Sequence, residues 1–368
     1  MNNDFLLFQL EPTMLIDAFL YNPPTDFKSC FVALNGKQIP AFATDFDLLL
    51  TADESIQNFV HFVSRFLPDE FCNFLFRRRA LFIGTTVSEF ALFPAEINLQ
   101  ELKPVLLNKM AEEHVKFLIV KDIATEAPFL SAEEIILADK ICSSLTAAGF
   151  VLIEGQALAY VPINFTSETE FLSRFSKRHR SNFRRKLRKR SDLELQIIST
   201  GDLQFCNSDK INSYYRLYEN VYKNSRIHFD KLSRTFFAKV LNDDTSGGLV
   251  FEYSYQGHCI GYFLCFHRGE YIIDKYMGAE YPAFRENNLY FVSWFDILQY
   301  ALDHSCKYAI FGWTSPEIKA YLGAHFVFTK HAIYPANPLL RRGLAHLSGV
   351  FESDRKALEK IQGKHKTR

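Results

Sequence analysis

The order of strand and helix patterns after residue 193 limits most strongly what this chain can fold into. One strand pattern is followed by two helix patterns, then by three strand patterns with turns at Gly257 and Gly269, and finally by alternating helix and strand patterns. In chain order the predicted elements are Leu193–Ser199, about Asp209–Lys223, about Asp230–Leu241, Leu249–Tyr255, His258–Phe266, Tyr271–Met277, Leu289–His304, Lys307–Phe311, Ser315–Leu322, Ala324–Tyr334 and about Leu339–Ile361. Strands joined by tight turns pair antiparallel, so this order predicts an α/β (α+β) unit with a mixed, mostly antiparallel sheet flanked by helices.

The first half of the chain also alternates strand and helix patterns, which predicts a second unit of the same class. Asn35-Gly36, the dipeptide best suited to a type I′ hairpin, separates two strand patterns. Ser55–Phe66 has apolar residues at helical spacing. Ser131–Glu134 carries the capping-box pattern that opens a helix, and Gly149 lies where that helix is expected to end.

The composition is that of a globular protein. Hydrophobic residues make up 48% of the chain and charged residues 23%, whereas disordered chains have few apolar residues. No run of about 18 apolar residues predicts a transmembrane helix, and the start of the chain lacks the basic segment of a secretory signal. None of the seven cysteines belongs to a CxxC pair, which indicates reduced, mostly buried thiols. We therefore expect a cytoplasmic protein without a transmembrane segment.

The neutral net charge hides an asymmetry between the two halves. Residues 1–176 contain 12 basic and 23 acidic side chains, and the remainder contains 30 basic and 19 acidic ones. The segment Lys177–Arg190 alone holds nine Lys and Arg and no acid. Such a concentration of one sign of charge predicts that this segment faces an anionic partner or an acidic part of the protein.

A family resemblance rests on three segments: RHRSNFRRKLRKR at 178–190, IIDKYMGAEYPAFRENNLYF at 272–291 and IFGWTSPEIKAYLGAHF at 310–326. They resemble the double-GNAT proteins related to the Fem peptidoglycan aminoacyltransferases (FemAB-like), and the order of elements after residue 193 is also that of the GNAT acyltransferase fold. The resemblance implies two GNAT-like units. Their expected limits are a degenerate N-terminal domain at 1–165, a basic linking helix at 166–190, an acyltransferase domain at 191–345 and a C-terminal helix or tail at 346–368.

The resemblance implies an enzyme that moves an acyl group from acyl-CoA, its co-substrate, to an amine acceptor, with no cofactor bound permanently. A second interpretation is tRNA-dependent aminoacyl transfer to a cell-wall precursor, because Fem-type enzymes take their donor from tRNA. A third is a protein without catalytic activity that binds a polyanion or a partner through Lys177–Arg190. In either enzyme catalysis is mainly positioning, together with a side chain that removes the proton of the attacking amine.

The first candidate site is the loop before the helix predicted to begin at Leu289. Free N–H groups and the positive dipole end of a helix suit a pyrophosphate. Arg285 can bind phosphate oxygens, and Asn287 or Asn288 can cap the helix. The segment Ala279–Asn288 contains no glycine, unlike the common GNAT loop, so acyl-CoA binding here is implied by the resemblance alone. The alternative is a capped loop with a solvated arginine.

Asp274 and Tyr276 form the second candidate site, as catalytic groups expected to lie near the reacting atoms. On a regular strand they share one face with Ile272. Burial among apolar neighbours raises the pKa of a carboxyl, which suits a general base or an orienting group. The alternative is that Asp274 pairs with Lys275, Arg268 or a helix end.

Lys319 is the third candidate, because the resemblance implies that a lysine at this position lies in the acceptor cleft and meets an anionic group. Gly312 allows the backbone to approach a ligand closely. Trp313, Thr314 and Ser315 form the turn after it and complete the candidate substrate site. The alternative is an exposed lysine on a short helix. These candidates together place the active site between the C-terminal sheet and the inter-domain cleft.

Ser167 is the predicted N-cap of a single helix that carries the basic segment. One stripe of this helix is apolar or aromatic and consists of Phe171, Phe175, His179, Phe183 and Leu187. The stripe indicates that one face packs on the protein, whereas Arg184, Arg185 and Arg188 belong to the cationic side. Three roles stay open for that side: closing the domain interface, binding tRNA or another polyanion, and docking on anionic lipid.

No metal site is predicted. His325 and His331 lie six residues apart on one strand pattern, too distant to bind one metal by themselves, and neither has a Cys or Asp at metal-ligand spacing. No GxSxG motif occurs, so Ser-His-Asp hydrolysis is not predicted either.

Overall fold

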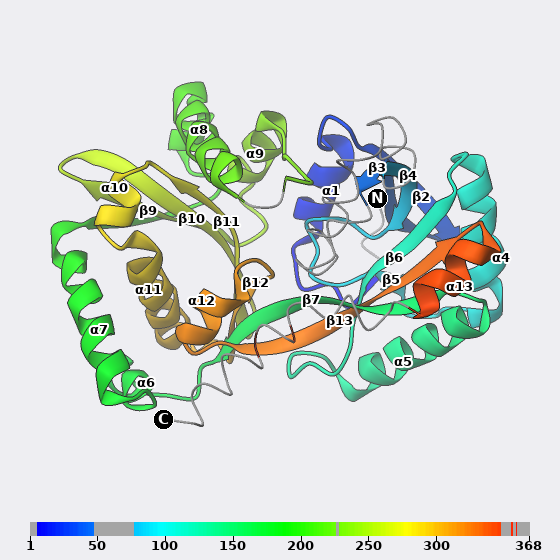
Figure 1. The fold of residues 1–368 in the computed structure, drawn as a ribbon. Helices are drawn as coiled ribbons and strands as arrows, with labels where there is room; N and C mark the ends of the chain where they lie inside the picture. Colours follow the sequence, from blue (N-terminus) through cyan, green and yellow to red (C-terminus); the bar gives the residue numbers. More distant parts are fainter. Residues whose placement is uncertain (1–5, 48–76, 226–227, 347–354, 356–357, 359–368) are drawn as a thin grey trace, which may run out of the picture. The chain divides into compact units, whose positions relative to one another are not determined.

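The computed structural model describes residues 6–47, 77–225, 228–346, 355 and 358 (Figure 1). It divides into two compact units: unit 1 comprises Met1–Leu10, Phe19–Ala159 and Trp313–Arg368, and unit 2 comprises Glu11–Ala18 and Tyr160–Gly312. The helix predicted at Ser55–Phe66 and the end of the helix predicted at Leu339–Ile361 lie outside the described residues. The domain limits inferred from the resemblance stay a prediction.

Unit 1 is built on a mixed sheet. Its strand order is β2 (Lys28–Leu34), β3 (Lys37–Asp47), β4 (Arg77–Ile83), β6 (Phe117–Ile123), β13 (His325–Pro335) and β7 (Val151–Pro162). Asn35 and Gly36 have φ angles of 51° and 74°, as a type I′ turn requires, which confirms the predicted hairpin between β2 and β3. The other elements of this part are β1 (Leu6–Leu7), β5 (Phe93–Pro94), α1 (Thr13–Tyr21, which both units share), α4 (Leu99–Glu112), α5 (Ala132–Ala147), α12 (Pro316–Tyr321) and α13 (Pro338–His346). The capping box predicted at Ser131 and Glu134 opens α5 and is confirmed.

His331 lies on β13, with its side chain only 12% exposed. Nδ1 of His331 accepts a hydrogen bond from the Asp122 backbone N–H at 3.0 Å, so the proton of the neutral ring is on Nε2. Thr329 Oγ1 donates to Asp122 Oδ1 at 3.1 Å. Burial lowers the pKa of His331 below its usual value of 6.5, although the Asp122 charge acts in the opposite direction.

We expect the free energy of unfolding to fall as the pH drops through 6.5, because unfolded His331 then takes up a proton while the buried ring stays neutral. The stability contributed by the neutral ring is complete above that pH and is lost below it. Replacing His331 with glutamine removes this group, so urea unfolding should show a shallower acidic decline for the variant than for the unmodified chain. Parallel pH profiles for the two proteins would contradict the expectation.

Unit 2 contains five further strands, and all neighbours among them except one pair are antiparallel. Its strand order is β12 (Tyr308–Gly312), β11 (Tyr271–Ala279), β10 (His258–Arg268), β9 (Gly248–Tyr255) and β8 (Glu194–Ser199). β11 and β12 form the parallel pair. The mixed, mostly antiparallel strand pairing, with helices flanking the strands, confirms the predicted α/β class.

Helices cover both faces of the unit 2 sheet (Figure 1). On one face lie α8 (Ser208–Asn224) and α9 (Arg234–Leu241), and on the other lies α11 (Leu289–Asp303), preceded by α10 (Ala283–Glu286). The ring of Tyr214 on α8 stacks on Tyr262 of β10 at 4.4 Å. A Cβ atom at Gly278 would lie 2.7 Å from the Leu217 Cβ, so glycine allows α8 to approach β11 this closely. The helix predicted from Asp230 begins only at Arg234.

The basic segment is not one helix, as was predicted, but two: α6 (Glu168–Ser173) and α7 (Lys177–Leu187). Ser167 caps α6 as expected, but the Ser176 side chain also accepts a hydrogen bond from a backbone N–H, that of His179, and starts a new helix there. A short 3₁₀ turn, η1 (Arg188–Asp192), follows α7, and a second one, η2 (Leu203–Cys206), follows β8. No helix in the described part of the chain combines the length and hydropathy that spanning a bilayer requires.

Candidate functional site

The two parallel strands of unit 2 separate at their carboxyl ends. β11 pairs with β12 over three residues, the last pair being Ile273 and Ile310. Beyond that point β11 continues along β10 to Ala279, while β12 ends at Gly312, whose φ of 68° suits glycine. In open sheets, ligands bind outside the carboxyl ends of parallel strands, where neighbouring strands part. The carboxyl ends of β11 and β12, where the pairing of the two strands ends, are therefore the candidate functional site of unit 2.

A β-bulge shapes β11 at this site. Along the ladder with β10, Cys265 pairs with Asp274 and Leu264 pairs with Tyr276, so Lys275 is the extra residue. The prediction that Asp274 and Tyr276 share one face of the strand is wrong, because the extra residue between them shifts the alternation of side chains. Asp274 lies on the α11 face and Tyr276 on the α9 face.

The Asp274 carboxylate is half-buried beside a thiol and a phenol. Cys265 Sγ donates to Asp274 Oδ1 at 3.8 Å, and burial, together with the Asp274 charge, raises the pKa of that thiol well above its usual value. Burial and the same charge also raise the pKa of Tyr290 on α11. Both neighbours therefore stay protonated, and the role of Asp274 as a proton acceptor stays a prediction. A thiol with a raised pKa is a poor nucleophile, so Cys265 is not a candidate for covalent catalysis.

Lys275, the bulged residue, forms a buried ion pair with Glu11. Its Nζ lies 3.2 Å from Glu11 Oε1, and the side chains are 6% and 0% exposed. Glu11 begins the N-terminal segment that belongs to unit 2, so this segment anchors the bulge next to Asp274. No motif in the sequence pointed to Glu11, Cys265 or Tyr290.

Tyr276 packs among aromatic rings on the other face of the sheet. Its ring meets Phe236 and Phe237 of α9 edge to face, each with a centroid distance of 5.7 Å. Tyr218 of α8 contacts Phe237 at 4.6 Å, which extends the same group. The Tyr276 ring is thus held in one orientation, and its role in catalysis stays a prediction.

The start of α11 differs from the predicted capped loop. Asn288 has a left-handed φ of 51° and makes no side-chain cap bond, and Asn287 turns its amide back to the Ala283 carbonyl oxygen at 3.0 Å. The expected capping by Asn287 or Asn288 is therefore wrong, because α10 occupies the preceding turn and uses the Asn287 side chain. Arg285 is exposed and lies 4.6 Å from the Tyr281 ring centroid, while Leu289 is fully buried. Phosphate binding by these residues stays a prediction.

Lys319 lies in unit 1 and is only 4% exposed. The alternative of an exposed lysine on a short helix is therefore wrong: α12 is short, but the lysine is buried. Ser315 precedes α12 with a left-handed φ of 54°, and both it and Thr314 are exposed, whereas Trp313 is half-buried. A lysine this buried normally has a partner, so the burial of Lys319 has a structural explanation, and its role in binding an acceptor stays a prediction.

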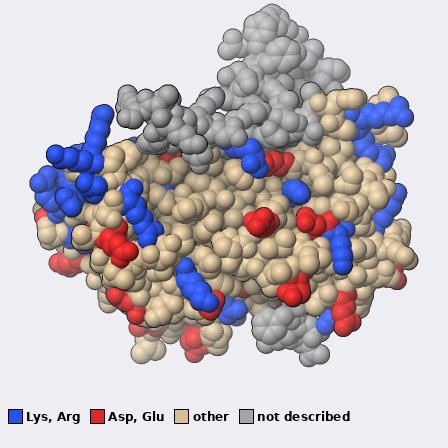
Figure 2. All heavy atoms as spheres, turned by 90° about the horizontal axis from the view of Figure 1, so that it is seen from below, with Lys and Arg blue, Asp and Glu red and all other residues tan. Residues whose placement is uncertain are grey.

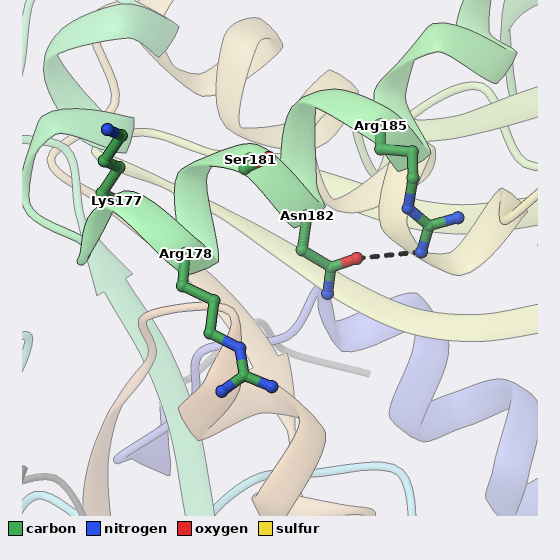
Figure 3. A pocket seen from close by; sticks show the side chains of 5 residues that line it. All are labelled: Lys177, Arg178, Ser181, Asn182 and Arg185. Atoms are coloured by element: carbon green, nitrogen blue, oxygen red, sulfur yellow. Dashed lines mark hydrogen bonds between the residues drawn. The ribbon is translucent and has the colours of Figure 1, made fainter.

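The predicted stripe on the basic segment is confirmed. Phe183 is fully buried and lies 5.8 Å from Phe295 of α11, measured between ring centroids. The opposite side of α7 is cationic, and Figure 2 shows Lys and Arg side chains gathered at the edge of the molecule where Figure 1 places α7. Figure 3 shows the side chains of Arg178, Asn182 and Arg185 extending to one side of the helix, with Arg185 hydrogen-bonded to Asn182 at 3.0 Å. Arg184, Arg185 and Arg188 are exposed, as expected.

Residues 105–323, more than half of the chain, match the model of the FemAB-like family, described by peptidoglycan biosynthesis and recognition. No curated protein sequence matches the chain.

Several solved structures are similar in fold. The C-terminal domain of a protein described as a lysylphosphatidylglycerol synthetase from Agrobacterium fabrum is 10% identical, with a TM-score of 0.53, over 92% of this chain and 95% of that one. The L-PGS structure from Bacillus licheniformis is 9% identical, with a TM-score of 0.51, over 93% of this chain and 98% of that one. FemX is 12% identical, with a TM-score of 0.48, over 92% of this chain and 94% of that one. At these identities the likeness of the first two concerns the fold alone.

Proposed function

Because the chain belongs to the FemAB-like family of transferases, we propose that it moves an aminoacyl group from aminoacyl-tRNA to an amine of a peptidoglycan precursor. The observation that carries this proposal in the structure is the position of Asp274. It is the first residue of β11 beyond its pairing with β12, at the carboxyl ends of two parallel strands.

The proposed reaction is a direct transfer. The acceptor amine attacks the ester carbonyl carbon, a C–N bond forms, and the C–O bond to the ribose of the tRNA breaks. Asp274 accepts the proton of the attacking nitrogen, and that proton passes to the departing ribose oxygen. The enzyme gains most of its rate from holding the two reactants at this site, as transferases without a covalent intermediate do.

Tyr276 and Lys319 complete the proposed machinery. The aromatic group around Tyr276 restrains the strand segment that carries Asp274, and the ammonium of Lys319 binds an anionic group of the acceptor. Gly312, with the turn Trp313–Ser315 after it, contributes backbone to the acceptor side. These roles follow the family resemblance.

Transfer from acyl-CoA is a second candidate, and the position of α11 favours it. This helix follows β11 at the same end of the strands, and the positive dipole end of a helix suits a pyrophosphate, with Arg285 nearby. The glycine-free segment Ala279–Asn288, which forms a helical turn before α11, disfavours it relative to tRNA.

The test is an assay of the purified full chain with a soluble muramoyl-pentapeptide precursor and either a mixture of charged tRNAs or acetyl-CoA. We expect mass spectrometry to show a precursor heavier by one aminoacyl residue, only with charged tRNA. Acetylation of the precursor without aminoacylation would show that acyl-CoA, and not aminoacyl-tRNA, is the donor. No product from either donor would contradict the proposed function with this acceptor class.

A further inference from the structure

The nine cations of the basic segment divide into two groups. Four of them contact other groups of the protein. Arg180 donates a hydrogen bond to the Phe175 carbonyl oxygen (2.7 Å), and the Lys186 ammonium lies over the Phe291 ring (3.2 Å to its centroid). Lys189 forms an ion pair with Asp192 (3.5 Å), and Arg190 forms ion pairs with Glu168 and Asp296 (2.9 Å each). The other five form the cationic face: Lys177, Arg178, Arg184, Arg185 and Arg188. All five are exposed, and within the described ranges none has an acidic partner within 4 Å. Ion pairing inside the described protein therefore does not account for these five.

Helical geometry keeps the cationic face on one side of α7. A step of seven residues leads from Lys177 to Arg184 and from Arg178 to Arg185, and a step of four leads from Arg184 to Arg188, the C-cap of α7. Phe183 points into the protein. Ser181 and Asn182 lie between the cations and line the same open hollow, which Figure 3 shows. The face is thus a one-sided array of charges and not a deep pocket.

Exposed aliphatic side chains lie near the end of the basic segment. Leu195 and Ile197 on the edge strand β8 are 41% and 44% exposed. They pair in the ladder with Tyr253 and Phe251, and the Tyr253 hydroxyl donates to Asp296 Oδ2 at 2.9 Å.

Asp296 also binds Arg190, the last cation of the segment, so the start of β8 borders the end of the basic segment. Alternation along the strand turns the neighbouring acid, Glu194, to the other face of the sheet.

We propose that the cationic face, together with Leu195 and Ile197, docks unit 2 on an anionic phospholipid surface. The five cations bind headgroup phosphates, and the two aliphatic side chains enter the boundary between headgroups and acyl chains. The rings of this segment pack inside the protein, with Phe183 fully buried, so they offer no surface for stacking on unpaired bases, and phosphate contacts with a folded RNA would leave Leu195 and Ile197 unused. Exposed aliphatic side chains beside free cations fit a lipid interface better.

The test is flotation of the full chain with vesicles of phosphatidylcholine, with and without phosphatidylglycerol. We expect binding only when phosphatidylglycerol is present, and weaker binding as salt is added. Each cation removed should lower the partition coefficient about fivefold, so the variant Arg184→Ala/Arg185→Ala/Arg188→Ala should bind about 100-fold more weakly. The variant Leu195→Ser/Ile197→Ser should bind several-fold more weakly.

Two matched controls separate this face from general surface effects. The variant Lys103→Ala/Lys116→Ala/Lys140→Ala removes three exposed cations of unit 1, and Leu203→Ser removes an aliphatic side chain that is 85% exposed beyond the other end of β8. Both should bind vesicles as the unmodified chain does, and circular dichroism should show every variant folded.

Two outcomes would overturn the proposal. One is vesicle binding that the triple arginine variant or the Leu195/Ile197 variant leaves unchanged. The other is binding to tRNA but not to phosphatidylglycerol vesicles, lost in the triple arginine variant, which would assign the cationic face to RNA.

Discussion

Replacing Asp274 with asparagine is expected to lower the kcat of the transfer by about 10²–10⁴-fold, the usual contribution of a general base. Asparagine is nearly the same size and keeps an oxygen that accepts the Cys265 thiol, so the strand and its neighbours stay in place. The variant cannot take the proton of the attacking amine. The KM for both substrates should therefore change little, because the lost interaction exists only in the transition state.

Single-turnover assays with charged tRNA and the peptidoglycan precursor measure this effect. Glu286 offers a matched control, because it is an exposed carboxylate on α10 and Glu286→Gln makes the same chemical change there. Its kcat should equal that of the unmodified chain. A kcat for Asp274→Asn within about tenfold of the unmodified value would remove Asp274 from the role of base.

The order of elements in unit 2 could be predicted because each element has a clear local pattern. The strands Leu249–Tyr255 and His258–Phe266 and the helix at Leu289 match β9, β10 and α11 within a few residues. The stripe through Phe171 and Phe183 was also predictable, because the buried face of a helix carries apolar residues at helical spacing. Hydrophobic periodicity is therefore the sequence signal from which these elements and their buried faces could be predicted.

The face that Asp274 occupies could not be predicted. A bulge inserts one residue without changing which residues are polar or apolar, and Lys275 looks like any exposed strand residue in the sequence. The helix break at Ser176, in contrast, has a sequence signal, because a serine is a common N-cap residue. The apolar stripe continues across Ser176 and therefore favoured a single helix.

Glu11 was missed for another reason: it lies 264 residues from Lys275, and no local pattern records a contact over that separation. The burial of Lys319 had no sequence signal for the same reason, since α12 carries polar and apolar residues without a clear period. Long-range ion pairs and buried single charges depend on the tertiary structure.

Replacing Glu11 with alanine is expected to lower the free energy of unfolding by about 3–5 kcal/mol, because it removes a carboxylate that is paired with the buried ammonium of Lys275. Both side chains are nearly inaccessible to water, so solvent cannot replace the lost interaction. Urea unfolding followed by circular dichroism measures the change as a lower midpoint with an unchanged slope. Lys307→Ala is a suitable comparison, because Lys307 and its partner Glu270 are 62% and 63% exposed, so Glu270 stays hydrated.

The double variant Glu11→Leu/Lys275→Met distinguishes a lost charge partner from lost packing. If the ion pair explains the effect, replacing both charges with apolar side chains of similar volume should recover most of the stability that Glu11→Ala loses, because no charge is then left buried. Simple loss of packing predicts that the double variant is at least as unstable as Glu11→Ala. Single variants that each lose less than about 1 kcal/mol, with effects that add in the double variant, would mean that the two residues do not interact in solution. In that case the contact with the N-terminal segment would not be what stabilises the bulge that positions Asp274.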